Sequence, residues 1–293
     1  MAKSKVYFTP IITPEKMIEM YDILNKQLSG KIAIKLHSGE QGNKNYLRPE
    51  FLKPIIDYVG GTVVECNTAY EGARNTTEKH YKLIREHHWD EYFDFDLMDS
   101  EGPDMCLPIK NGTMLHENYV GKNLAKYDSL LVLSHFKGHT MGGYGGALKQ
   151  LSIGVASSKG KTLIHSGGKT DDQYKLWDIA LTQDPFMICM AEAASSITDY
   201  FKGNAAYISC MVNMSVDCDC DGNAAPPCMK NIGILSSLDP VALDRACLDM
   251  VINSDDPGKD EFMERVNSRH GQVTVEMAEK LGIGSTDYEL IKI

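Results

Sequence analysis

Three cysteines near residue 220 form the clearest group of side chains in this sequence that could bind a metal. Cys218 and Cys220 are separated by one aspartate, and seven residues separate Cys220 from Cys228. Thiolates bind zinc and iron well, because sulfur is soft and carries charge once it is deprotonated. We predict that these three cysteines hold zinc or an iron–sulfur cluster. The fourth position is left to another cysteine, a histidine, an aspartate or an exogenous ligand.

A second interpretation stays open, because this cysteine spacing matches no common zinc ribbon or ferredoxin pattern. The thiols could instead be buried, or belong to a redox-labile loop that forms a transient disulfide. Asp217, Asp219 and Asp221 alternate with the cysteine pair, and their charges should raise the pKa of metal-free thiols. The aspartates, a glycine and two prolines also argue against deep apolar burial, and therefore favour the metal site.

Histidine and lysine side chains directly follow two apolar segments that read as strands. His135, Lys137 and His139 follow residues 129–134, and His37 follows residues 31–36 just before Glu40. Histidine changes charge near neutral pH, so it serves as a general acid, a general base or a metal ligand. We predict His37, His135, Lys137 and His139 as catalytic candidates. The alternative for each is a structural role in a polar loop.

Two further segments favour the binding of an anion. Gly143, Gly145 and Lys149 belong to a glycine-rich turn that leads into a predicted helix near residue 146. Glycine lets the backbone approach a ligand, and a helix N-terminus favours negative charge. Asn67 and Arg74 lie in the loop after another strand, where arginine could hold a carboxylate or phosphate with two bonds. We predict that these residues bind the anionic group of a small molecule, and a solvated surface loop is the alternative.

These segments need a scaffold, and the chain alternates helix, glycine and strand in a way that supplies one. Predicted strands cover residues 31–36, 62–66, 129–134, 206–212 and 232–235, with a last strand near 288–293. One predicted helix starts at residue 14. Further predicted helices cover residues 50–59, 77–89, 186–201 and 240–252, and two short ones follow residue 260. This alternation predicts an α/β fold with a largely parallel or mixed sheet and helices on both faces. Ligands then lie beyond the carboxyl ends of the strands.

The pattern shows no repeat and no linker. We therefore predict a single domain over residues 1–293, or two intimate lobes, with the irregular segment 93–120 as an insertion. The 40 acidic and 30 basic residues give a net charge of −10, which argues against nucleic-acid and anionic-membrane binding. There is no signal-peptide pattern and no apolar run of about 20 residues. We expect a cytoplasmic protein whose eight cysteines are thiols or metal ligands.

Taken together, these segments resemble the DUF362 family, a set of largely uncharacterised prokaryotic proteins that are often described as iron–sulfur proteins. The matching residues are 37–40, 67–74, 134–139, 147–149, 218–220, 232–235 and 239–242. The run Ser-His-Phe-Lys-Gly-His at 134–139 is the most specific of them. The resemblance implies an iron–sulfur cofactor. Many members carry an inserted C-x-x-C-x-x-C ferredoxin module, which this sequence lacks. The family is also distantly similar to lactate-racemase-type proteins, in which His and Lys hold a nickel-pincer nucleotide.

Two functions follow as hypotheses from different classes. The first is a metal- or iron–sulfur-binding cytosolic protein, a redox or cofactor-dependent enzyme acting on a small anionic molecule, with a redox protein as a partner. The second is a non-catalytic module that binds a small ligand or a partner and contains a structural zinc or a cysteine-stapled loop. The sequence predicts neither the substrate nor the reaction.

Overall fold

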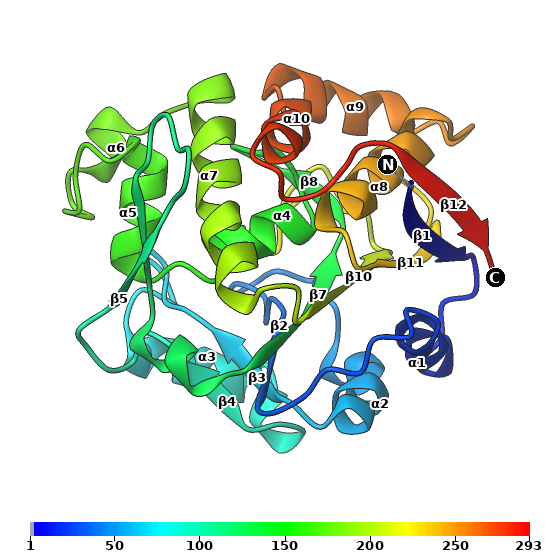
Figure 1. The fold of residues 1–293 in the computed structure, drawn as a ribbon, viewed down its shortest axis with the longest axis horizontal. Coiled ribbons are helices and arrows are strands. Elements are labelled where there is room, and N and C mark those ends of the chain that lie inside the picture. Colours follow the sequence, from blue (N-terminus) through cyan, green and yellow to red (C-terminus); the bar gives the residue numbers. More distant parts are fainter. Residues whose placement is uncertain (1–2) are drawn as a thin grey trace.

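The computed structural model of the chain describes residues 3–293, and its centre is one eight-stranded mixed sheet (Figure 1). The strands lie in the order β12-β1-β11-β10-β7-β2-β3-β4. The pairs on either side of β11 are antiparallel, and all other neighbouring pairs in this sheet are parallel. Their bounds are β1 Ser4–Thr9, β2 Ile32–Lys35, β3 Thr62–Glu65, β4 Phe95–Leu97, β7 Ser129–His135, β10 Ala205–Met211, β11 Gly233–Ser237 and β12 Tyr288–Lys292. The predicted α/β fold with a mixed sheet is confirmed.

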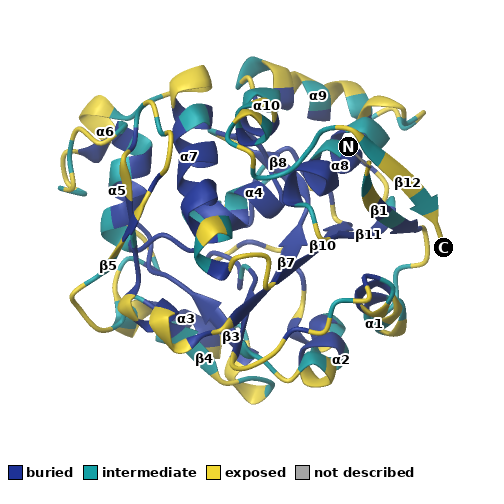
Figure 2. Cartoon of the chain, viewed as in Figure 1, coloured by how far each residue is buried: buried dark blue, intermediate teal, exposed yellow. Residues whose placement is uncertain are grey.

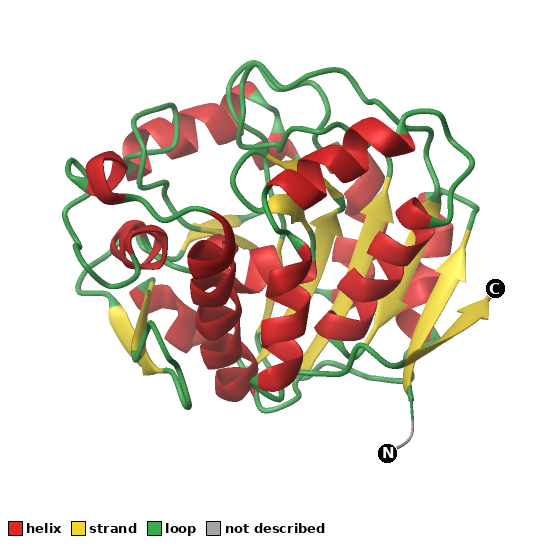
Figure 3. Cartoon of the chain, turned by 90° about the horizontal axis from the view of Figure 1, so that it is seen from above, coloured by secondary structure: helices red, strands yellow, loops and turns green. Residues whose placement is uncertain are grey.

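Helices cover both faces of this sheet, as predicted. Along β7, Leu131 and Leu133 pack with the helices α1 to α3, whereas Leu130 and Val132 pack with α4, α7 and α8. Successive side chains of a strand point to opposite faces, so a strand buried on both sides is apolar throughout. Figure 2 shows the burial along the sheet and the exposed outer sides of the helices, and Figure 3 shows the strands side by side. The helices are α1 Pro14–Asp22, α2 Pro49–Val59, α3 Thr77–Glu86, α4 Ala147–Lys149, α5 Ser158–Ser166, α6 Leu176–Ile179, α7 Gln183–Phe201, α8 Pro240–Ile252, α9 Lys259–Ser268 and α10 Gln272–Lys280.

Local sequence signals explain where several of these helices begin and end. Thr13 accepts a hydrogen bond from the Lys16 backbone N–H and precedes a proline, which starts α1. The Asp239 carboxylate caps α8 in the same way, by accepting the first free backbone N–H groups. Gly60 ends α2 with a left-handed conformation, φ 72°, that glycine adopts without strain. The sequence did not predict α5, although it supplies two residues of the site described below.

Only the first strand of segment 93–120 belongs to the main sheet. Its first strand, β4, pairs with β3 at the edge of the main sheet. Its other strands, β5 (Met105–Pro108) and β6 (Glu117–Val120), form a separate hairpin that lies against α5 and α7. A second hairpin, β8 (Lys137–His139) with β9 (Gly143–Gly145), follows β7 directly. Across the described residues, every helix is too short or too polar to cross a bilayer.

Candidate metal and anion site

Four neighbouring parallel strands end at the same edge of the sheet and bring the predicted segments together. The loops after β2, β3, β7 and β10 all contribute to a pocket of about 690 Å³. The pocket therefore lies where open parallel sheets usually bind their ligands, beyond the carboxyl ends of the strands. The predicted site residues that line it are His37, Arg74, His139, Lys149 and Cys220.

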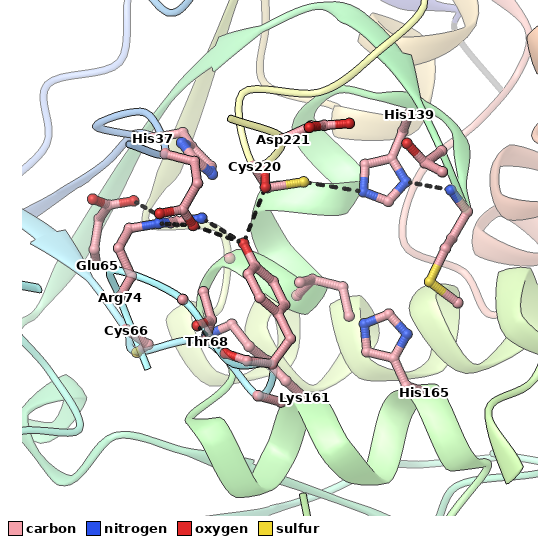
Figure 4. Close-up of a pocket in the computed structure, with 18 of the residues that line it drawn as sticks. His37, Glu65, Cys66, Thr68, Arg74, His139, Lys161, His165, Cys220 and Asp221 are labelled. Carbon is pink, nitrogen blue, oxygen red and sulfur yellow. Dashed lines mark hydrogen bonds and ion pairs between the residues drawn. The ribbon is translucent and has the colours of Figure 1, made fainter. Parts of the chain in front are cut away.

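Two of the predicted cysteines meet one of the predicted histidines beside this pocket. His139 and Cys220 line it, whereas Cys218 is buried and covered from it. The donor atoms of His139, Cys218 and Cys220 all lie within 4.8 Å of one another. The two sulfurs are 2.6 Å apart, and Cys220 Sγ lies 3.8 Å from His139 Nε2 (Figure 4). Lys149 reaches the pair from α4 and donates to Cys218 Sγ at 2.9 Å. The side chains thus combine two thiols, an imidazole and a cation.

The charges of the two thiols are strongly different. Burial raises the pKa of Cys218, but the hydrogen bond from Cys220 and the charge of Lys149 outweigh it and lower that pKa well below the usual value. The same hydrogen bond, together with burial, raises the pKa of Cys220. The pair therefore holds one thiolate and one thiol. Burial lowers the pKa of Lys149, but the facing Cys218 thiolate raises it by more. The net pKa therefore lies above its usual value, and this lysine stays charged.

Cys228 does not join this group in the structure. Its thiol donates to the Met214 carbonyl at 3.3 Å, and burial raises its pKa to about 11. Asp221 and Gly222 still line the pocket, but Cys228 does not. Its sulfur lies outside the set formed by His139, Cys218 and Cys220. The structure therefore brings His139, rather than Cys228, to the cysteine pair.

The aspartate between the two cysteines holds their loop in place. Asp219 is fully buried and accepts from His135 Nδ1 at 2.9 Å and from Lys137 Nζ at 2.8 Å. His135 Nε2 faces the Val212 carbonyl at 2.5 Å, so both ring nitrogens face acceptors. Although burial alone would raise it, the charges of His135 and Lys137 lower the pKa of Asp219 below its usual range. His135 and Lys137 were predicted as catalytic residues. In the structure their side chains bind Asp219 and thereby position this loop.

The glycine-rich turn forms the β8–β9 hairpin, and an internal carboxylate occupies the helix end behind it. Asp244 accepts from the backbone N–H groups of Ala147 and Leu148 at 2.7 and 2.9 Å, at the start of α4. Gly143 and Gly145 are buried in the hairpin and contribute no surface to the pocket. The helix N-terminus that we predicted to hold an exogenous anion is thus satisfied by the protein itself.

Replacing Asp244 by asparagine should lower the free energy of unfolding by about 1–3 kcal/mol, because an amide can accept at one end only. Its NH₂ group would face a backbone N–H that has no other acceptor. Urea denaturation followed by circular dichroism measures this loss. A variant as stable as the wild-type protein would show that the carboxylate does not stabilise α4.

The remaining predicted residues divide between the pocket and its support. His37 lines the pocket, and its Nδ1 accepts from the Gly39 backbone N–H at 3.0 Å. Burial lowers the pKa of His37 well below its usual value, so the ring is neutral and carries its proton on Nε2. Asn67 lies behind the pocket and bonds to Thr77 and His80. It therefore supports the loop after β3.

The pocket also contains a cluster of buried charges. Arg74 was predicted from the sequence as a binding residue, but Lys35 and Glu65 were missed. Lys35, Arg74 and Lys161 are each less than a tenth exposed, and they share this end with the buried carboxylates Glu40 and Glu65. Arg74 Nε donates to Glu40 at 3.1 Å, and Lys35 Nζ lies 3.8 Å from Glu65. Lys35 is the last residue of β2, and Glu65 is the last residue of β3. Both strands are otherwise largely apolar in sequence, so these two charged residues were read only as parts of strands. Buried charges in strands were the signal that could have found them.

Among curated proteins, no match to this chain was found. Two solved structures resemble it at low identity. The first is the lactate racemase apoprotein from Thermoanaerobacterium thermosaccharolyticum, with a TM-score of 0.46 and 13% identity over 80% of this chain and 54% of that one. The second is a protein from Thermotoga maritima, with a TM-score of 0.43 and 12% identity over 96% of this chain and 61% of that one. The chain thus spans less than two thirds of either protein. A family described as a domain of unknown function, DUF362, matches residues 32–249, and the chain belongs to this family.

Proposed function

We propose that this protein is an enzyme that binds one metal ion through Cys218, Cys220 and His139 and acts on a small organic anion in the adjoining pocket. The observation that carries the proposal is the convergence of these three donors, two of which line the pocket. Two sulfurs and one nitrogen form a soft donor set that suits zinc or iron. Three protein ligands also leave a position open, as catalytic zinc sites do.

The donor set fits a single ion better than a conventional cluster. Iron–sulfur clusters are usually held by four ligands, and Cys228, the next cysteine along the chain, does not reach the pair. Binding requires two local changes. The sulfurs must separate from 2.6 Å to roughly 3.8 Å, the spacing that Zn–S bonds of about 2.3 Å impose in a tetrahedron. His139 must also carry its ring proton on Nδ1 instead of Nε2, so the hydrogen bonds that Nδ1 accepts from the Met141 and Gly142 backbone N–H groups must open.

The surrounding residues would hold the substrate and balance its charge. Lys149 keeps Cys218 ionised and compensates the charge that a second thiolate adds. Arg74 and Lys161 provide the positive charge that an anionic substrate requires. Neutral His37 offers an N–H to a reacting oxygen. A metal in the open site would polarise a substrate carbonyl or phosphoryl oxygen, or activate a bound water.

Metal analysis of the purified protein tests this proposal. We expect about one equivalent of a transition metal per chain, without acid-labile sulfide and without the broad absorption near 400 nm of an iron–sulfur cluster. Iron with matching sulfide in anaerobically purified protein would favour the cluster instead. Protein that stays metal-free after titration with zinc and ferrous iron under reducing conditions would exclude both forms.

A second candidate has one observation in its favour, which is the short distance between the two sulfurs. At 2.6 Å, Cys218 and Cys220 are closer than non-bonded sulfurs normally approach, although still longer than the roughly 2.05 Å of a disulfide. The pair could therefore close a disulfide that staples the loop. In that case thiol titration of air-purified protein would find two thiols fewer than in reduced protein, and zinc would bind only after reduction.

A further inference from the structure

The pocket has two ends of different chemistry, and both have features that call for a ligand. One end contains buried cations, and the other contains apolar and aromatic side chains. Helix α5 connects the two ends, because Lys161 and His165 lie four residues apart on it and both line the pocket (Figure 4). Residues at this spacing share one face of a helix, with Cβ atoms about 6 Å apart.

At the cationic end, Lys161 is buried without a negative partner. It is 7% exposed, and its Nζ donates to the Ala156 carbonyl at 2.6 Å. Among residues 3–293, no carboxylate oxygen lies within 4.0 Å of this Nζ, whereas Lys35 and Arg74 both have such partners. An ammonium group has three N–H donors, so Lys161 keeps donors free. A buried charge without a counterion is costly, and a bound anion would remove that cost.

At the other end, a large aromatic side chain lines the pocket and remains half exposed. Trp177 is 52% exposed, and its ring centroid lies 5.9 Å from that of His165. His165 is itself stacked on Phe186, at 4.6 Å and 14°. Burial lowers the pKa of His165 to about 3, so its ring is neutral. Met141 and Ile153 complete this apolar wall. An indole in this position would gain from covering by a second planar group.

His165 adds a second unsatisfied group between the two ends. Its Nδ1 is buried and has no hydrogen-bond partner among the described residues. Buried polar atoms are nearly always paired, so His165 would gain a hydrogen bond if its ring turned this nitrogen toward a ligand in the pocket. The volume of about 690 Å³ also exceeds what a simple inorganic anion fills, and falls in the usual range for larger organic ligands.

From these observations we infer that the pocket binds an aromatic organic anion, with its phosphate, phosphonate or carboxylate beside Lys161 and its ring against Trp177. That this molecule is a substrate rests on the function proposed above. The binding itself rests on α5 and Trp177, which are separate from the cysteine pair. Binding and metal content can therefore fail independently.

Three probes separate the contributions of the two ends in calorimetric titrations of the full-length protein. Phenylphosphonate has both the anion and the ring, methylphosphonate has the anion alone, and benzyl alcohol has the ring without the charge. We expect phenylphosphonate to bind at least about tenfold more tightly than either of the others, because burying a ring and pairing it with Trp177 adds to the charged contact.

Two variants then test each end against a matched control. Lys161→Met should weaken both phosphonates by roughly 10–100-fold, because a single charge-assisted contact is lost. Lys159→Met, on the same helix but stacked over Tyr119 at 3.9 Å, should change little. Trp177→Ala should remove most of the advantage of phenylphosphonate over methylphosphonate. Tyr174→Ala removes an exposed aromatic side chain of the same segment that does not line the pocket, and should leave that advantage intact.

Each other outcome would overturn the inference. Equal affinity for the two phosphonates would exclude the aromatic end, as would a Trp177→Ala variant that keeps the preference. Normal phosphonate binding by Lys161→Met would exclude the cationic end, and absence of phenylphosphonate binding would exclude both. Metal content is measured on the same samples. Protein that binds phenylphosphonate as described but stays metal-free after titration with zinc and ferrous iron would reject the proposed metal enzyme. Metal-loaded protein without this binding would reject the aromatic anion.

Discussion

Replacing Asp219 by asparagine is expected to lower the free energy of unfolding by about 3–5 kcal/mol, the usual cost of breaking a buried ion pair. The Asp219 carboxylate is 1% exposed and pairs with His135 and Lys137, both of which are also buried. An amide is neutral and offers a single acceptor, so two buried donors would lose their counterion. Urea denaturation at neutral pH measures the difference between variant and wild type.

The same carboxylate predicts how this stability depends on pH. Because its pKa is lower in the folded protein than in the unfolded chain, the contribution is complete above the ordinary aspartate pKa of about 4. It is lost as the pH falls from there toward the lower pKa of the folded state. The loss caused by Asp219→Asn should therefore be largest at neutral pH and should shrink in acid.

Asp221→Asn provides the control for this experiment. Asp221 belongs to the same loop, is partly exposed, and accepts from the Asn223 backbone N–H at 2.8 Å. Its replacement should cost less than about 1 kcal/mol. Equal losses for the two variants, or a stable Asp219→Asn protein, would contradict the structural role that we assign to Asp219.

The sequence predicted the scaffold well because hydrophobic pattern and helix caps are local signals. The strand 129–134 was predicted from its apolar run alone, and β7 is buried on both faces over Ser129–His135. Thr13 and Asp239 each precede a proline at the start of a helix, which is a local capping signal, and both accept backbone hydrogen bonds as caps do. The rule that ligands lie beyond the strand ends then located the pocket without any further information.

The roles of single side chains could not be predicted in the same way, because they depend on contacts between distant segments. Nothing near His135 in the sequence indicates that Asp219, 84 residues away, would bind its ring. The glycine turn predicted an exogenous anion at the start of α4. The Asp244 carboxyl group, almost 100 residues further along the chain, occupies that helix end instead. Cys228 is near the cysteine pair in sequence, but the fold gives the third position to His139.

Substitutions of the ligands are expected to distinguish two possible metal sites. One is the set of His139, Cys218 and Cys220 in the structure, and the other is the three-cysteine site that the sequence predicts. Cys218→Ser and Cys220→Ser each remove a thiolate, and His139→Ala removes the imidazole. Each should weaken metal binding by more than the roughly 10–100-fold that loss of a supporting partner costs. Cys228→Ser is the matched control, since it makes the same chemical change on the same segment. It should bind metal as the wild-type protein does.

Competition with a chromophoric chelator under reducing conditions measures these affinities, and elemental analysis gives the stoichiometry. The fold of each variant is checked by circular dichroism, because serine at position 218 leaves the Lys149 ammonium without its thiolate. If Cys228→Ser lost the metal as completely as Cys218→Ser, the chain after Cys220 would have to rearrange on binding, and three cysteines would form the site. If His139→Ala kept full affinity, the ligands would be the two thiolates together with groups from the solvent or the substrate. Loss in Cys218→Ser, Cys220→Ser and His139→Ala, with retention in Cys228→Ser, is the result that the arrangement of these side chains predicts.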